Sequence, residues 1–151
     1  MSDSVRPDMT AIDPIVIVRE TAAAPAAAWS ALVDPAHVRQ WFTDASPVGR
    51  VGDAYRLDFG DSIVEGIVSE IVPGHRFAYT WSWAHDDPRH QTHVSWEVQP
   101  LPGGGSRLTL RHDGWTEVAA NEATRDDHAG YWEGYLDDLV NHLETEPDAS
   151  G

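Results

Sequence analysis

Residues 62–83 read SIVEGIVSEIVPGHRFAYTWSW, and residues 91–115 read QTHVSWEVQPLPGGGSRLTLRHDGW. Apolar and polar residues alternate along much of both stretches, and the turn residues Pro73-Gly74 and Gly103–Gly105 interrupt them, which predicts antiparallel strands joined by sharp turns. One long amphipathic helix is expected to follow over Thr124–Glu144. A twisted sheet followed by a single long helix is typical of a sheet that grips the helix and leaves an apolar space between the two layers.

The residues before this region predict a short strand, two helices and another strand. Ile15–Glu20 is a β-branched run, and Asp53–Phe59 alternates like a strand. Pro25 suits the first turn of one helix; Asp34 suits the N-cap of a second helix that begins at Pro35. We therefore expect one domain over residues 14–144, with residues 1–13 and 145–151 as flexible ends.

The alternation also predicts which side chains face inward. In His75–Trp83, one face carries Phe77, Tyr79, Trp81 and Trp83. In the long helix, the 3.6-residue repeat gathers Trp132, Leu136, Leu139 and Leu143 into a stripe, flanked by His128 and Tyr135. The paired apolar residues of Ile63–Val72 leave its register open, and a bulge is expected near Gly66.

Composition excludes several classes of function. The chain has no cysteine, so it forms no disulfide and no thiolate metal site. It has no lysine, so Schiff-base chemistry and a P-loop are also excluded. The formal net charge of −15 disfavours nucleic acid as a partner. The polar N-terminal stretch MSDSVRPDMTAIDP is unlike a signal peptide, and no apolar run suits membrane insertion, so we expect a cytoplasmic protein.

The chain resembles the START-like (SRPBCC) superfamily, and within it the group named for the C-terminal domain of the activator of the heat-shock protein 90 ATPase. The resemblance lies in APAAAWSALVDPAHVRQWF, EGIVSEIVPGHRFAYTW, VSWEVQPLPGGGSRLTLRHDG and HAGYWEGYLDDLVNHLE, within about residues 14–144. It implies an α+β, helix-grip (START/Bet v-like) fold in the order βααβββββα, with a curved antiparallel sheet wrapped around the long C-terminal helix.

The resemblance also implies a cavity between the long helix and the concave face of the sheet. Carried over by position, the expected ligand-binding residues are Trp41, Phe42, Phe59, Tyr79, Trp81, Trp96, Leu110, His112, His128, Trp132 and Leu136. These aromatic side chains have two interpretations: a binding wall for a small molecule, or core that fills the space between sheet and helix. His112 and His128 are either ligand contacts, an acid–base pair, or hydrogen-bonded core residues.

Three further features have an unremarkable explanation beside a functional one. His85, His90 and His93 with Asp86 and Asp87 are metal-ligating residue types, but their spacing fits no known motif, and a solvated loop is expected. Two roles are open for Arg76, Arg107 and Arg111: they form cross-strand ion pairs, or they form a patch that binds a partner. The three glycines at 103–105 form a hairpin tip, since no helix follows them.

The function expected from the sequence is a binding module that holds an apolar or aromatic small molecule, with no cofactor, no catalytic residue and no metal. A co-chaperone-like protein-interaction domain is one alternative. A cyclase, dehydratase or hydrolase that uses the same cavity is another. No G-x-S-x-G motif is present to indicate a serine nucleophile.

Overall fold

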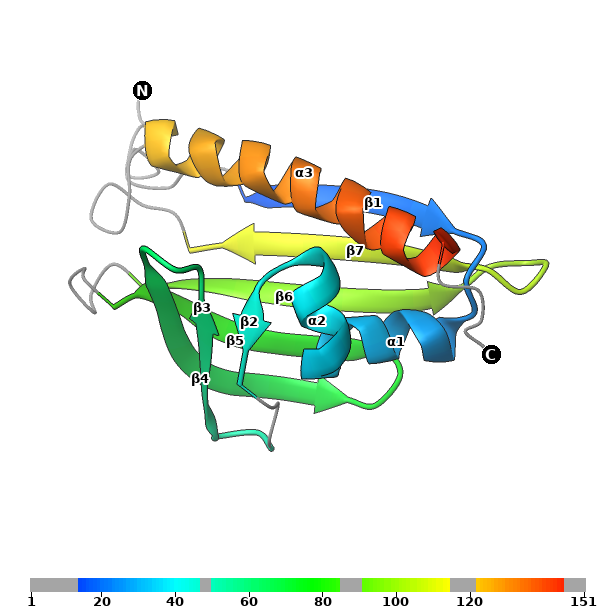
Figure 1. Ribbon diagram of the computed structural model, residues 1–151, viewed down its shortest axis with the longest axis horizontal. Helices are drawn as coiled ribbons and strands as arrows, with labels where there is room; N and C mark the ends of the chain where they lie inside the picture. The colour runs from blue at the N-terminus through cyan, green and yellow to red at the C-terminus, as the bar shows by residue number, and fades with distance from the viewer. Residues whose placement is uncertain (1–13, 47–49, 85–90, 115–121, 146–151) are drawn as a thin grey trace, which may run out of the picture.

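The computed structural model describes residues 14–46, 50–84, 91–114 and 122–145. Three helices lie against one face of a seven-stranded antiparallel sheet (Figure 1). The strands are β1 Ile15–Thr21, β2 Asp44–Ala45, β3 Ala54–Asp58, β4 Ile63–Val72, β5 Arg76–Trp83, β6 Thr92–Pro100 and β7 Ser106–Asp113. The helices are α1 Pro25–Val33, α2 Pro35–Trp41 and α3 Glu122–Thr145.

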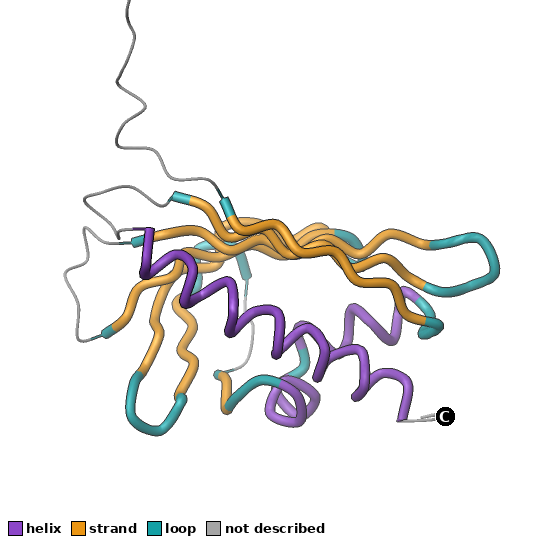
Figure 2. Tube along the Cα trace, turned by 90° about the horizontal axis from the view of Figure 1, so that it is seen from above, coloured by secondary structure: helices purple, strands orange, loops and turns teal. Residues whose placement is uncertain are grey.

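The sheet has the order β1-β7-β6-β5-β4-β3-β2, so the first strand of the chain pairs with the last. Seen along the sheet, the strands curve around the helical layer, and all three helices lie on the same side (Figure 2). The α+β helix-grip fold expected from the sequence is confirmed, with α3 as the gripped helix.

Local sequence explains where the two short helices begin. Pro25 and Pro35 each occupy the first turn of a helix, where the missing backbone N–H costs nothing. The Asp34 carboxylate accepts a hydrogen bond from the backbone N–H of Ala36 at 3.0 Å, which caps α2 as predicted. The corner between α1 and α2 therefore comes from one Asp-Pro pair.

The core lies between the concave face of the sheet and the helices. The inward faces of β5, β6 and β7 are buried as the alternation predicts, and the buried stripe of α3 is Trp132, Leu136 and Leu139. Gly130 and Gly134 lie on the exposed side of α3, with open space beside them. The amphipathic pattern thus gave the correct helix face.

Three details differ from the sequence-based expectation. The chain forms an additional strand, β2, so the order is βααββββββα; two residues are too few to produce a readable alternation. Helix α3 begins at Glu122, two residues before Thr124. The register shift in β4 lies between Val68 and Glu70, so the extra residue of the bulge is Ser69 rather than one at Gly66.

Other expectations fall partly outside the described residues. These are the flexible end at 1–13, the flexible end at 145–151 except for Thr145, which is the last residue of α3, and the His85–His90 part of the candidate metal cluster. Within the described ranges, no group of three or more metal-ligating side chains lies close enough to hold an ion. The described helices also include none with the length and apolar character needed to cross a bilayer.

Candidate functional site

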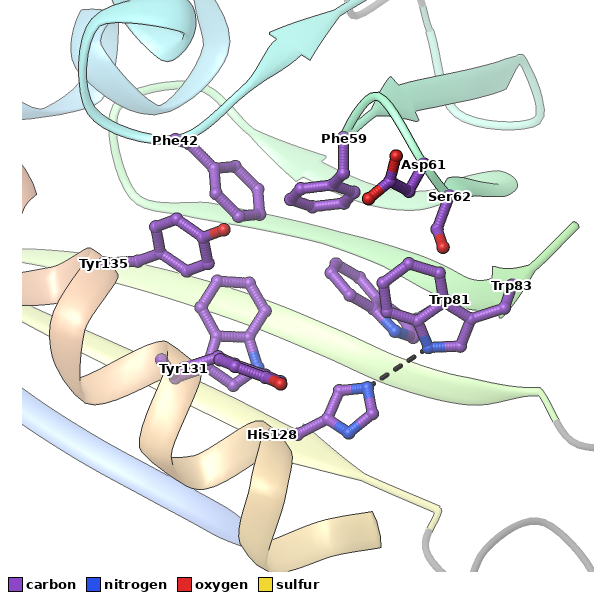
Figure 3. Close-up of a pocket in the computed structure, with 10 residues that line it drawn as sticks. Phe42, Phe59, Asp61, Ser62, Trp81, Trp83, His128, Tyr131 and Tyr135 are labelled. Carbon is purple, nitrogen blue, oxygen red and sulfur yellow. Dashed lines mark hydrogen bonds between the residues drawn. The ribbon is translucent and has the colours of Figure 1, made fainter.

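A pocket lies between the β3–β4 turn, the end of β5 and the first half of α3 (Figure 3). We call it the ring pocket. Its volume is about 270 Å³. Most of its lining side chains are aromatic; the full set is Phe42, Phe59, Asp61, Ser62, Trp81, Trp83, His128, Tyr131, Trp132 and Tyr135.

The regular spacing of residues in β5 and α3 places most of these side chains in the pocket lining. In β5, Trp81 and Trp83 are two residues apart and share the concave face. In α3 the lining residues follow the helical repeat of three and four, which places them on one side of the helix: His128, Tyr131, Trp132 and Tyr135. Phe42 directly follows the last residue of α2, and Phe59, Asp61 and Ser62 come from the β3–β4 turn.

The rings of the ring pocket contact one another at steep angles. Phe42 meets Tyr135 with centroids 4.7 Å apart and planes inclined by 76°, and it meets Phe59 at 5.4 Å and 75°. Trp81 and Trp83 are nearly perpendicular, at 5.8 Å and 89°. Edge-to-face contacts of this kind are favourable for aromatic side chains.

His128 is the imidazole in the described lining of the ring pocket. The indole N–H of Trp83 donates a hydrogen bond to Nε2 of His128 at 3.2 Å, and Figure 3 shows this bond as a dashed line. A nitrogen that accepts a hydrogen bond carries a lone pair, so His128 is neutral in this arrangement. The imidazole is buried, although it belongs to the pocket lining.

His112 lies deeper, inside the core, and does not line the ring pocket. Its Nδ1 accepts a hydrogen bond from the indole N–H of Trp132 at 3.0 Å, and its Nε2 lies 2.7 Å from Thr92 Oγ1. Because Nδ1 is the acceptor, the imidazole hydrogen is on Nε2 and points at the threonine hydroxyl. Burial lowers the pKa of His112 well below 6.5, and the nearby His128 and His93 lower it further.

Trp81 carries a buried polar atom that needs an explanation. Among the described residues, its indole N–H has no hydrogen-bond partner. The ring lines the ring pocket and lies against Trp83 and His128, with centroids 5.8 Å and 6.2 Å away. A buried N–H without an acceptor is unfavourable, so a bound molecule that places an acceptor within reach of this nitrogen would be stabilised.

The predicted site residues divide into three groups. Five of them line the ring pocket: Phe42, Phe59, Trp81, His128 and Trp132. Three line a separate space of about 30 Å³ beneath α2: Trp41, Tyr79 and Trp96. The remaining three are fully buried in the core and line neither space: Leu110, His112 and Leu136. The structure thus brings about half of the predicted set together around one cavity.

Five lining residues were absent from the predicted set: Asp61, Ser62, Trp83, Tyr131 and Tyr135. Two of them carried a usable signal, because Trp83 shares the inward face of β5 and Tyr135 flanks the apolar stripe of α3. Tyr131 is 65 % exposed and forms part of the rim. Asp61 and Ser62 belong to a turn, where no periodicity indicates the direction of a side chain.

Arg76 and Arg107, on the outer face of the sheet, form the cross-strand ion pairs that the simpler interpretation of the sequence predicted, whereas Arg111 pairs within its own strand, β7. Arg107 pairs with Glu20 at 3.0 Å, Arg111 pairs with Asp113 at 2.9 Å, and Arg76 lies 3.5 Å from a carboxylate oxygen of Glu70. Exposed pairs of this kind contribute little to stability. The three arginines that the sequence singled out on that face therefore have carboxylate partners within the sheet.

Solved structures share this fold at low sequence identity. DynU16, from the dynemicin biosynthetic locus, superposes with a TM-score of 0.78 at 24 % identity, over 89 % of this chain and 48 % of that chain, so the present chain spans about half the length of DynU16. Protein MLL2253 from Mesorhizobium loti gives a TM-score of 0.78 at 21 % identity, over 87 % and 97 % of the two chains. The Aha1 dimer from Colwellia psychrerythraea gives 0.76 at 20 % identity, over 89 % and 98 %.

No curated protein matches this chain. The sequence pattern of the family described as "Activator of Hsp90 ATPase homolog 1-like protein" matches residues 22–144. This match covers α1 and α2, the strands that follow them and almost all of α3, so it includes every residue of the ring pocket. The chain therefore belongs to the activator of Hsp90 ATPase homolog 1-like family, within the START-like superfamily.

Proposed function

We propose that this domain binds a small apolar or aromatic molecule in the ring pocket. The observation that carries the proposal is a cavity of about 270 Å³ in which seven of the ten lining residues are aromatic. Small-molecule sites are concave, largely apolar and supplied with a few polar groups that orient the ligand. The volume is close to the lower limit of about 300 Å³ for such sites, so the occupant is small.

Apolar contact supplies most of the affinity in this proposal. A ligand that buries about 200 Å² of apolar surface gains roughly 5 kcal/mol at about 25 cal/mol/Å². The loss of translational and rotational freedom offsets part of this gain, so we expect dissociation constants in the micromolar range. Flat aromatic molecules fit best, because the inclined rings of Phe42, Phe59 and Tyr135 offer both faces and edges.

One polar group of the ligand is expected to be a hydrogen-bond acceptor. Trp81 offers an indole N–H that has no partner among the described residues. Side chains enclose its nitrogen, so a ligand reaches it only after a neighbouring ring moves.

The test is a titration with lipids, flavonoids and polyketide-like aromatic compounds, followed by tryptophan fluorescence and by melting temperature. We expect micromolar binding by some aromatic members of the panel and a higher melting temperature in their presence. No ligand-dependent change across the whole panel would refute the proposal.

Two tryptophan variants identify the site in the same titration. Trp83→Ala removes a lining ring and should weaken binding at least tenfold. Trp29→Ala is the matched control, since Trp29 is also half-buried but contacts Phe77 away from the ring pocket. Equal losses in both variants would indicate a general effect on stability and argue against the ring pocket as the site.

The acid–base alternative has less support. It requires His112 and His128 to converge on one substrate, but the ring nitrogens of His112 are engaged with Trp132 and Thr92 inside the core. Of these two histidines, His128 lines the ring pocket and His112 does not, so a bound molecule there would contact His128 but not His112.

A further inference from the structure

The charges around the ring pocket have one sign. Its described lining contains one carboxylate, Asp61, and no arginine, and the chain has no lysine. His128 adds no positive charge while its Nε2 accepts the hydrogen bond from Trp83. The whole chain carries a formal net charge of −15. The pocket therefore attracts cations and repels anions.

The aromatic rings add to this preference. The face of an aromatic ring carries negative potential, and a cation held against several faces is stabilised by each of them. In the ring pocket, Phe42 is inclined by 75° to Phe59 and by 76° to Tyr135, while Trp81 is inclined by 89° to Trp83. All five rings line the ring pocket and come from different elements, so a cation in the pocket has aromatic rings on more than one side.

The carboxylate and the rings lie together at one end of the pocket. Asp61 and Phe59 both belong to the β3–β4 turn, and Figure 3 shows them side by side above the two indoles of β5. The ring centroid of Phe59 lies 5.7 Å from that of Trp83 and 6.4 Å from that of Trp81. An ammonium group placed among these rings would have Asp61 as its counter-charge.

We propose that the preferred ligand of the ring pocket is an organic cation: a tertiary or quaternary ammonium group attached to a small aromatic or apolar body. This inference rests on the proposed binding function and narrows it to one chemical class. The ammonium group lies against Phe59 and the β5 indoles beside Asp61, and the apolar body lies against Phe42 and Tyr135. A neutral ligand of the same shape keeps the apolar contacts but loses the attraction to the ring faces and the carboxylate.

The test compares two probes that differ only in charge. The 3-hydroxyphenyltrimethylammonium ion and 3-tert-butylphenol have nearly the same shape, with nitrogen in one replaced by carbon in the other. Titration calorimetry at low ionic strength should give at least tenfold tighter binding of the cation, because cation–aromatic attraction adds to the apolar contact. Added salt should reduce this difference, since it screens Asp61 and the net charge.

Substitution of the carboxylate localises the effect. Asp61→Asn keeps the size of the side chain and should weaken cation binding several-fold while leaving 3-tert-butylphenol unchanged. Glu65→Gln is the matched control: it removes one negative charge from the exposed face of β4, outside the ring pocket, and should alter neither probe. Melting temperatures of both variants check that the fold is retained.

The outcomes separate this inference from the proposed function. Equal or tighter binding of 3-tert-butylphenol would overturn the cation preference and leave small-molecule binding intact. Weakening by Glu65→Gln equal to that by Asp61→Asn would overturn the role of Asp61 as counter-charge. Binding of neither probe would also overturn the cation preference, and the aromatic and lipid panel would then decide separately whether the pocket binds any ligand.

Discussion

The indole N–H of Trp132 donates a hydrogen bond to Nδ1 of His112 across the interface between α3 and the sheet, with 3.0 Å between the nitrogens. On its other side, the imidazole meets the hydroxyl of Thr92 on β6 at 2.7 Å. All three side chains are buried. Because a buried polar group is costly without its partner, this chain of contacts favours one placement of α3 along β7 over a shifted one.

A double-mutant cycle measures this contact. His112→Leu leaves the indole N–H of Trp132 without an acceptor, and Trp132→Phe leaves Nδ1 without a donor. Each single variant should lower the free energy of unfolding by about 2–3 kcal/mol, from lost packing and an unpaired buried group. The double variant should lose about 1–2 kcal/mol less than the sum. Urea denaturation gives these values, and strictly additive losses would show that the two rings do not interact.

The same imidazole predicts a pH dependence of stability. The pKa of His112 in the folded protein lies well below 6.5, chiefly because the side chain is buried. The unfolded chain takes up a proton near pH 6.5 while the folded chain does not, so protonation favours unfolding. This contribution to stability is complete above about pH 6.5 and is lost as the pH falls, by at most about 1.4 kcal/mol per pH unit.

The measurement is the free energy of unfolding of the parent protein and of His112→Leu between about pH 8 and about pH 5. Other titrating groups affect both proteins, so the difference between the two curves isolates His112. We expect the advantage of the parent protein to shrink as the pH falls. A difference that stays constant with pH would contradict a neutral, buried His112.

The fold could be predicted from the sequence because its signals are local. The alternation in β5 buries Phe77, Tyr79 and Trp81, and the helical repeat in α3 buries Trp132 and Leu136. These patterns follow from the periods of strand and helix alone. Strand β2 escaped prediction because its two residues pair with β3 without producing any pattern of their own.

The candidate site was less predictable because a cavity depends on packing between distant segments. Trp41 and Trp81 have the same side chain and both lie inward, yet Trp41 packs edge-on against Trp96 at 5.8 Å while Trp81 lines the ring pocket. Periodicity identifies an inward face but not the place where two inward faces fail to meet. Asp61, the one carboxylate of the lining, lies in a turn and has no such signal at all.

Gly66 lies opposite Tyr55 in the pairing of β4 with β3. The Tyr55 hydroxyl donates to the backbone carbonyl of Thr80 on β5, so the ring crosses β4 at the glycine. The Thr80 hydroxyl in turn accepts a hydrogen bond from the backbone N–H of Ile67 at 2.9 Å. A Cβ at position 66 would collide with the backbone oxygen of Thr80 and with the Tyr55 ring. The absence of a side chain is therefore required here.

Gly66→Ala should lower the free energy of unfolding by about 2 kcal/mol or more, because the collision involves backbone and a buried ring. The matched variant is Gly130→Ala on the exposed side of α3, where an added Cβ meets open space. Alanine is the better helix former, so this variant should gain about 0.5–1 kcal/mol. Urea denaturation of the two variants should therefore give changes of opposite sign. A neutral Gly66→Ala would mean that the Tyr55 ring moves aside without cost, and that its contact with Thr80 does not hold β3 against β5.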